Sequence, residues 1–144
     1  MVPRFRARLL PLLTYGLLAL AGCERDEGPP CYPVRGTILY EGKPVPHAFV
    51  VLHPATPEGR NGSRPSAVAN AKGEFALTSR KARDGAPTGE YVATVEWRPL
   101  VQRKGEYEPG PNRLPNRYSK PESSGLRIQV GAGNNELPPL TLKR

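Results

Sequence analysis

The side chains that could carry out chemistry are few in this chain of 144 residues. It has two cysteines, Cys23 and Cys31, and two histidines, His47 and His53. A nucleophile needs a general base within reach, and a zinc ion needs three or four clustered ligands. Neither histidine lies near a second ligand or a nucleophile in the spacing that such sites use. The chain therefore predicts a protein that is not an enzyme and has no metal site and no cofactor.

The acidic residues allow one further site to be considered. Asp84, with Glu74 or Glu90 and nearby carbonyl groups, could contribute to a calcium site, which requires several oxygen ligands. The sequence Asp84-Gly85-Ala86-Pro87 is more typical of a turn in which the aspartate hydrogen-bonds the backbone. We therefore interpret Asp84 as a turn residue. A hydrolase remains an alternative only if the fold joins His47 or His53 to a serine and a carboxylate in one pocket.

Cys23 ends an N-terminal segment with the layout of a secretory signal. Arginines at positions 4, 6 and 8 precede an apolar run from Leu9 to Leu20, and Ala21-Gly22 then leads into Cys23. A basic start, a short apolar run and small residues before the cleavage point are typical of such signals. The run is also short for a transmembrane helix. We predict a signal peptide over residues 1–22, cleaved between Gly22 and Cys23.

The sequence Leu20-Ala21-Gly22-Cys23 also resembles the lipobox of bacterial lipoproteins. The resemblance implies a diacylglyceryl group on the Cys23 thiol and usually a further acyl chain, such as palmitate, on the new amino group. Two or more acyl chains hold a protein stably on a bilayer. We therefore expect a bacterial cell-envelope protein, lipid-anchored to the inner or the outer membrane, with residues 23–31 as its tether. An ordinary signal peptide that carries a cysteine is the alternative.

The composition of the predicted mature chain limits its partners. Removal of residues 1–22 leaves 122 residues, enough for one domain. Its 18 lysines and arginines against 13 aspartates and glutamates give a net charge of +5. This charge fits contact with phosphate-bearing lipid or polysaccharide, and the absence of a basic–aromatic array argues against nucleic acid. If Cys23 is acylated, Cys31 is either an inert thiol or a route to an intermolecular disulfide.

Short apolar runs with alternating side chains, separated by Pro- and Gly-rich turns, indicate strands. We predict seven of them, over residues 34–40, 48–53, 66–70, 74–78, 90–97, 126–130 and 137–142. The pattern predicts an all-β, seven-stranded Greek-key sandwich over residues 32–144, with no helix after the signal. Phe49, Phe75, Tyr91 and Trp97 are the expected core aromatics. Residues 48–53 are nearly all apolar, so we expect that strand to be buried on both faces.

Several turn and strand motifs follow one another in a recognisable order. They are Val34-x-Gly36-x-Ile38, Gly42-Lys43-Pro44, Gly73-x-Phe75-x-Leu77 and Asp84-Gly85-Ala86-Pro87-x-Gly89-x-Tyr91. In this order they resemble the carboxypeptidase regulatory-like (transthyretin-like, prealbumin-like) domains, and more narrowly small lipoproteins of that type from planctomycete-like bacteria. The resemblance implies a Greek-key sandwich with a structural or binding role. Transthyretin-like hydrolases end in Tyr-Arg-Gly-Ser, whereas this chain ends in Leu-Thr-Leu-Lys-Arg, so the resemblance does not extend to their activity.

Residues 98–125 have no clear period and are the best candidate for a binding segment. Long stretches without secondary structure in a compact domain are usually functional or disordered. The residues that we expect to contact an envelope protein or glycan are Arg103, Lys104, Tyr107, Arg113, Arg117 and Tyr118. In a small-ligand or carbohydrate-binding protein, Tyr107, Tyr118 and Trp97 would stack on sugar rings. The alternatives are a solvated loop, or a loop packed on the sheet through Leu114 and Tyr118.

Basic residues also gather in two predicted loops, residues 54–65 and 79–89. If successive strands reverse direction, both loops lie at the end of the domain beside the tether, and residues 98–125 lie at the other end. The basic residues of these loops are Arg60, Arg64, Arg80, Lys81 and Arg83. We expect them to contact anionic membrane head groups, where each basic residue contributes about 1 kcal/mol. The predicted function is a lipid-anchored, non-catalytic envelope module; the sequence specifies no oligomeric state.

Overall fold

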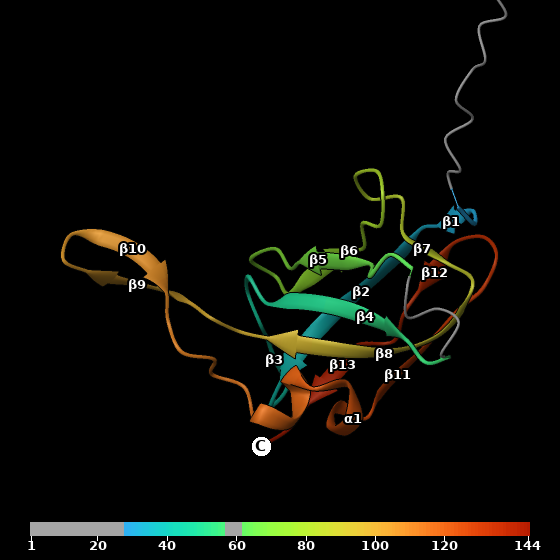
Figure 1. Cartoon of the computed structure of the whole chain (residues 1–144). Coiled ribbons are helices and arrows are strands. Elements are labelled where there is room, and N and C mark those ends of the chain that lie inside the picture. The colour runs from blue at the N-terminus through green and yellow to red at the C-terminus, as the bar shows by residue number, and fades with distance from the viewer. Residues whose placement is uncertain (1–27, 57–61) are drawn as a thin grey trace, which may run out of the picture.

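Two β-sheets make up most of the computed structural model, which describes residues 28–56 and 62–144 (Figure 1). Cys23, Gly22 and Arg60 therefore lie outside the described residues. The first sheet is antiparallel, and its strands in spatial order are β11 (Leu126–Val130), β8 (Gly89–Glu96), β4 (Phe49–Pro54) and β5 (Ser66–Val68). The second sheet surrounds β2 (Val34–Tyr40), with β3 (Lys43–Pro44) and β6 (Glu74–Ala76) antiparallel to it and β12 (Asn135–Glu136) and β13 (Leu140–Leu142) parallel to it.

The fold is the predicted all-β sandwich. A strand is present in each of the seven predicted positions, and the chain crosses repeatedly from one sheet to the other, as in Greek-key sandwiches. The parallel pairing of β2 with β13 departs from the simple rule that successive strands reverse direction. The structure adds two short strand pairs. One joins β1 (Cys31–Tyr32) to β7 (Ala86–Pro87), and the other joins β9 (Leu100–Arg103) to β10 (Glu106–Pro109).

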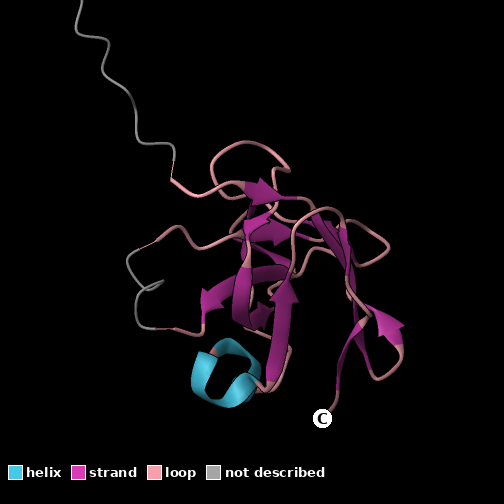
Figure 2. Ribbon diagram, turned by 90° about the vertical axis from the view of Figure 1, so that its right-hand side faces the viewer, coloured by secondary structure: helices cyan, strands magenta, loops and turns pink. Residues whose placement is uncertain are grey.

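The expectation of no helix is wrong for one short stretch. A 3₁₀-helix, η2 (Asn116–Ser119), is followed by the single turn α1 (Pro121–Ser124), which lies beside the strands in Figure 2. Pro121 occupies a position at the start of the turn where its missing N–H is not needed. Gly125 ends the turn with φ of 67°, a left-handed conformation that glycine adopts without strain. These two residues are signals that sequence analysis can detect, although the turn is too short to show a helical period.

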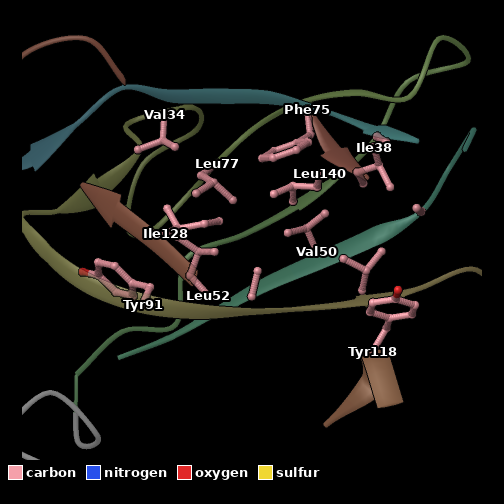
Figure 3. Packing of buried hydrophobic residues seen from close by; sticks show 14 of the residues in the cluster. Val34, Ile38, Val50, Leu52, Phe75, Leu77, Tyr91, Tyr118, Ile128 and Leu140 are labelled. Atoms are coloured by element: carbon pink, nitrogen blue, oxygen red, sulfur yellow. The ribbon is translucent and has the colours of Figure 1, made fainter. Parts of the chain in front are cut away.

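The core lies between the two sheets (Figure 3). Alternation along β2 is confirmed, because Val34 and Ile38 are buried whereas Arg35 is exposed. Each large aliphatic side chain buried in this way contributes about 1.5–3 kcal/mol. The fully buried side chains include Ile38, Leu52, Leu77, Leu142, Val34, Val45, Val50, Val95 and Val130.

The expectation that residues 48–53 are buried on both faces is wrong. Val50 and Leu52 point into the core, but Phe49 is 45 % exposed on the outer face of the first sheet. The reason is that no third layer from residues 28–56 or 62–144 covers the sheet at this position. Phe75 and Tyr91 are core aromatics as predicted, and Trp97 packs against the core while remaining partly exposed.

The strand register defines two ends of the sandwich. Pro54 at the end of β4 lies opposite Tyr91 near the start of β8, and Phe49 lies opposite Glu96 at the other end. The β1–β7 pair adjoins the first of these ends, which we call the tether end. The β9–β10 hairpin follows Glu96 and projects from the second, which we call the hairpin end (Figure 1).

Candidate interaction surface

The β9–β10 hairpin is the most prominent feature outside the sandwich. Its strands pair Leu100 with Pro109, Val101 with Glu108, Gln102 with Tyr107 and Arg103 with Glu106. Lys104 and Gly105 form the two-residue turn, with φ of 50° and 86°. Two successive positive φ values are the signature of a type I′ turn, whose twist matches that of the flanking strands. The hairpin is thus a regular element, and sequence analysis missed it inside residues 98–125.

The two faces of the hairpin differ in chemistry. Cross-strand partners share a face, so Leu100, Gln102, Tyr107 and Pro109 form one face that carries no charge. The opposite face carries Val101 and three charged residues, and there the Nε of Arg103 lies 3.0 Å from a carboxylate oxygen of Glu108. Leu100 is 65 % exposed and Tyr107 70 % exposed. The face formed by Leu100, Gln102, Tyr107 and Pro109 is therefore open to solvent, and we call it the uncharged face.

The base of the hairpin is attached firmly to the sandwich. The Gly110 N–H donates a hydrogen bond to the Pro99 carbonyl at 2.9 Å. The side-chain oxygen of Asn112 accepts hydrogen bonds from the N–H groups of Trp97 at 2.9 Å and Leu114 at 3.2 Å. The Arg113 guanidinium stacks over the Trp97 ring, 5.5 Å from its centroid. Arg113 and Trp97 thus contact each other, and the projecting strands start from a fixed base.

The rest of residues 98–125 packs on the sandwich, as the packed-loop alternative predicts. Leu114 and Tyr118 are buried, and Tyr118 is only 5 % exposed. The Tyr118 hydroxyl accepts a hydrogen bond from the Lys143 N–H at 2.9 Å, and the Arg117 guanidinium stacks over its ring at 4.8 Å. Burial would raise the pKa of Tyr118, but the Lys143 and Arg117 interactions outweigh it and hold that pKa below its ordinary value. Tyr118 is therefore not available for the partner contact or sugar stacking that we expected of it.

Arg117 is also occupied within the domain. Its guanidinium donates to the Lys143 carbonyl at 2.7 Å and to the Tyr118 hydroxyl at 3.0 Å. It joins η2 to the C-terminal residues and is not a free partner contact. Of the six residues expected to bind a partner, the structure therefore brings Arg103, Lys104 and Tyr107 together on the hairpin. It places Arg113, Arg117 and Tyr118 in the packed part of the segment.

The tether end collects the segments that the sequence places there. Residues 28–29, 62–63 and 87–91 line one groove of about 440 Å³ together with Pro54, Thr56 and Arg80. The Arg80 guanidinium donates to the Pro29 carbonyl and, at 3.0 Å, to the Cys31 sulfur, so it binds the tether. Arg64, Lys81 and Arg83 are exposed, and Arg83 faces a second groove with Arg35 and Glu74. The membrane contact expected of these residues stays a prediction.

Asp84 is a turn residue. Its carboxylate accepts hydrogen bonds from the N–H groups of Ser79 at 2.7 Å, Lys81 at 3.0 Å and Arg80 at 3.1 Å. Partial burial would raise the pKa of Asp84, but these backbone donors hold it below its ordinary value. In residues 28–56 and 62–144, no group of three or more metal-ligating side chains is present.

One groove is lined by both a histidine and a carboxylate, and the hydroxyl group beside that histidine belongs to a buried threonine, not to a serine. His53, Arg64 and Glu122 line the groove, and His53 Nε2 lies 2.9 Å from the Thr94 hydroxyl oxygen. Burial and the nearby Arg64 lower the pKa of His53, while Glu122 opposes them. Thr94 is 6 % exposed beneath the α1 side of the sheet, and no hydrogen bond joins Glu122 to His53 within the described part of the chain. His47, the other histidine, is exposed in a turn with φ of 58°.

Comparisons with known proteins add little to this picture. No family model and no curated protein match the chain. A candidate carbohydrate binding protein from Pseudomonas aeruginosa is similar in structure, with a TM-score of 0.40 and 14 % identity over 79 % of this chain and 88 % of that one. A 9R-lipoxygenase from Cyanothece is similar with a TM-score of 0.42 and 13 % identity over 78 % of this chain, which spans 16 % of the lipoxygenase. Within the described residues, no helix is long and apolar enough to cross a membrane.

Proposed function

We propose that this protein is a non-catalytic module of the bacterial cell envelope that contacts a protein partner through the uncharged face of its β9–β10 hairpin. In this proposal it is a carboxypeptidase regulatory-like domain, and lipid on Cys23 anchors it to a membrane. The observation that carries the proposal is the exposure of Leu100 and Tyr107 on a hairpin that projects from the sandwich. Exposed apolar side chains gathered on one face are typical of interaction sites, and Tyr is enriched at such interfaces.

The position of the hairpin supports this assignment. All four large hydrophobic side chains that are exposed in the described residues, Phe49, Val68, Leu100 and Tyr107, belong to the hairpin or to the adjoining end of the first sheet. Phe49 lies directly opposite Val68 on neighbouring strands. The tether leaves from the opposite end, so a lipid anchor at Cys23 would direct the hairpin away from the membrane.

The geometry around His53 supports a role without catalysis. A hydroxyl nucleophile must reach a substrate, and its base must be oriented by a third group. Thr94 is buried in the middle of β8, and Glu122 makes no hydrogen bond to the ring of His53 in the described residues. The His53–Thr94 hydrogen bond satisfies two polar groups beneath α1.

A glycan-binding role is the second candidate, and the exposed ring of Tyr107 is the observation that favours it. Aromatic rings present a large apolar surface with a polar tip. Trp97 is less suited to this role, because the Arg113 guanidinium covers its ring. A sugar-binding site would therefore depend on Tyr107, and the variant Tyr107→Ala should abolish binding on a glycan array.

Site-specific photocrosslinking in intact cells tests the proposal. A photoreactive amino acid replaces Tyr107 on the uncharged face or, as the matched control, its chain neighbour Glu106 on the charged face. We expect crosslinked products from position 107 and few from position 106, and mass spectrometry of these products should find peptides of a second protein. Equal yields from both positions would contradict the proposal, and products that a glycan hydrolase returns to the gel mobility of the uncrosslinked protein would favour the second candidate.

The anchor has its own test, which is intact mass spectrometry of the membrane-extracted protein. We expect a chain that begins at Cys23 and carries the mass of the acyl groups, and we expect that mass to be lost in Cys23→Ala. An unacylated chain would leave the hairpin proposal in place for a secreted or periplasmic protein. It would also permit a disulfide between Cys23 and Cys31.

A further inference from the structure

The hairpin by itself is an incomplete sheet. An isolated two-stranded hairpin is marginally stable in water, whereas three or more strands with an apolar face can be stable. Both strands of this hairpin are exposed along their length except for Val101, which is half-buried. Each strand also has an outer edge beside which the described part of the chain places no further strand, so its outward N–H and C=O groups are open to pairing. Such an edge is a template for pairing with another strand.

The register shows which groups point outward. Antiparallel partners alternate between pairs that exchange both backbone hydrogen bonds and pairs that exchange none. The two-residue turn makes Arg103 and Glu106 a bonded pair, and the Gly110-to-Pro99 hydrogen bond continues the same alternation. Leu100 and Gln102 therefore direct their N–H and C=O groups outward from β9. On β10 the corresponding residues are Tyr107 and Pro109.

The two edges are not equivalent. Pro109 has no N–H group, so the outer edge of β10 lacks a donor at one of its two positions. Pairing of two β10 edges about Tyr107 would also place Glu106 opposite Glu108 of the other copy, and like charges opposite each other are destabilising. The outer edge of β9 has both donors and both acceptors. It is therefore the edge that is open to a further strand.

The β9 edge is complementary to itself. Two copies related by a two-fold axis at Val101 place Leu100 opposite Gln102 of the second copy, and Gln102 opposite its Leu100. These four residues are the ones whose backbone groups point outward, so every outward N–H and C=O group gains a partner. Arg103 then lies opposite Pro99 of the second copy. That proline lacks an N–H group, but at a position where the pairing needs none.

We propose that β9 pairs in antiparallel fashion with β9 of a second copy of this chain, and that the two hairpins form one four-stranded sheet. This inference rests on the proposed role of the hairpin and names its first partner. The pairing is isologous, the commonest arrangement in soluble oligomers. In this register Lys104 of one copy falls opposite Arg98 of the other, whose guanidinium lies 2.7 Å from the Glu96 carboxylate of its own chain, which offsets the repulsion between the two cations.

Dimerisation would also enlarge the contact surface. Side chains on one face stay on that face across an antiparallel pair, so Leu100 and Tyr107 of both copies would lie on the same side of the new sheet. The uncharged face doubles in extent and remains open to another protein. Anchoring on one membrane would favour the pairing further, because tethering raises the effective concentration of the copies.

Disulfide trapping in membranes tests the pairing with the full chain. The variant Val101→Cys in a Cys31→Ser background places one thiol on the two-fold axis. The Val101 positions form a pair without backbone hydrogen bonds, with Cα atoms about 4.5 Å apart, which is within the range that a disulfide spans. Arg103→Cys and Tyr107→Cys are matched controls, since both positions are exposed on the same hairpin but lie away from the axis.

We expect mild oxidation to convert most of the Val101→Cys protein to a covalent dimer on non-reducing gels, and little of either control. Adding Gln102→Pro should abolish the crosslink, because it removes an outward N–H group while leaving the bonds within the hairpin intact. Equal crosslinking of all three variants, no crosslink at position 101, or an unchanged yield with Gln102→Pro would overturn the inference. A monomer that still crosslinks to another protein from position 107 would refute the dimer and leave the proposed function standing. A dimer that gives no crosslink to another protein from position 107 would support the β9 pairing and contradict the proposed function.

Discussion

Two tyrosines eleven positions apart, Tyr107 and Tyr118, show how one segment divides into two parts. Tyr118 is buried, and its hydroxyl exchanges hydrogen bonds with the backbone of Lys143. Tyr107 is 70 % exposed on a strand pair that projects from the domain. The segment that carries both has no apolar period, so the residue type alone does not separate the two roles. Partner groups supplied by the C-terminal residues make Tyr118 structural, and their absence around Tyr107 leaves it available for binding.

The largest expected effect separates these two tyrosines directly. Tyr118→Ala should lower the free energy of unfolding by about 3–5 kcal/mol, because it removes a buried aromatic ring. Tyr107→Ala should change it by less than about 0.5 kcal/mol, as is usual for exposed positions. Denaturant unfolding of both variants measures the difference. Similar losses in the two variants would show that the hairpin packs on the domain in solution.

The same contrast explains how much of the molecule can be predicted from the sequence. Strands that border the core alternate between apolar and polar residues because one face is buried, so β2 and β11 are predictable. The hairpin does not pack on the core, so neither of its faces must be apolar. Its sequence therefore lacks the alternation of apolar and polar residues that marks a half-buried strand. Its clearest signal is Lys104-Gly105 between two short extended runs, and Lys-Gly is a weaker turn signal than Asn-Gly.

The site residues follow the same rule. The solvent exposure of Tyr107 is consistent with the predicted partner contact, and that contact itself stays a prediction. The roles of Arg117 and Tyr118 depend on Lys143, which is 25 positions away from Tyr118 in the sequence. Likewise, the exposure of Phe49 depends on whether a third layer covers the sheet. No local pattern specifies either contact.

Two glycines extend the comparison to backbone conformation. Gly85 and Gly105 have nearly the same φ, 87° and 86°. A Cβ atom at Gly85 would lie 1.7 Å from the Tyr32 carbonyl oxygen, whereas at Gly105 it would meet nothing within 4 Å. Gly105→Ala should therefore cost about 1–2 kcal/mol locally, from the left-handed backbone alone.

Gly85→Ala has the same left-handed backbone strain and must also displace the backbone of Tyr32. Overpacking of this kind costs about 1–3 kcal/mol more. Thermal unfolding should therefore show a clear drop in Tm for Gly85→Ala and a small one for Gly105→Ala. Equal drops would mean that the β1–β7 contact contributes little to the stability of the tether end.

A pH titration sharpens the contrast between the sandwich and the hairpin. Burial and Arg64 lower the pKa of His53 from its ordinary value of 6.5, so the folded state binds this proton less readily than the unfolded state does. The stability from neutral His53 is complete above pH 6.5 and decreases as the pH falls below it. His53→Gln should flatten the dependence of Tm on pH in that range. If the slope of Tm against pH is unchanged in His53→Gln, the pH dependence arises from another titratable group.

The smallest effect is expected in the hairpin itself. Arg103 and Glu108 form an ion pair at 3.0 Å with side chains 68 % and 50 % exposed. Exposed pairs contribute between zero and about 1 kcal/mol, so Arg103→Gln should leave the unfolding transition almost unchanged. Hydrogen exchange is the sensitive measurement, because local opening of a projecting element does not require the sandwich to unfold. In the Arg103→Gln variant we expect faster exchange at the amides of β9 and β10 and unchanged exchange rates at all other amides. Faster exchange in β8 would instead show that the hairpin and the sandwich unfold as one unit. Tyr107 and Tyr118 would then differ in solvent exposure but not in the unit of the fold to which they belong.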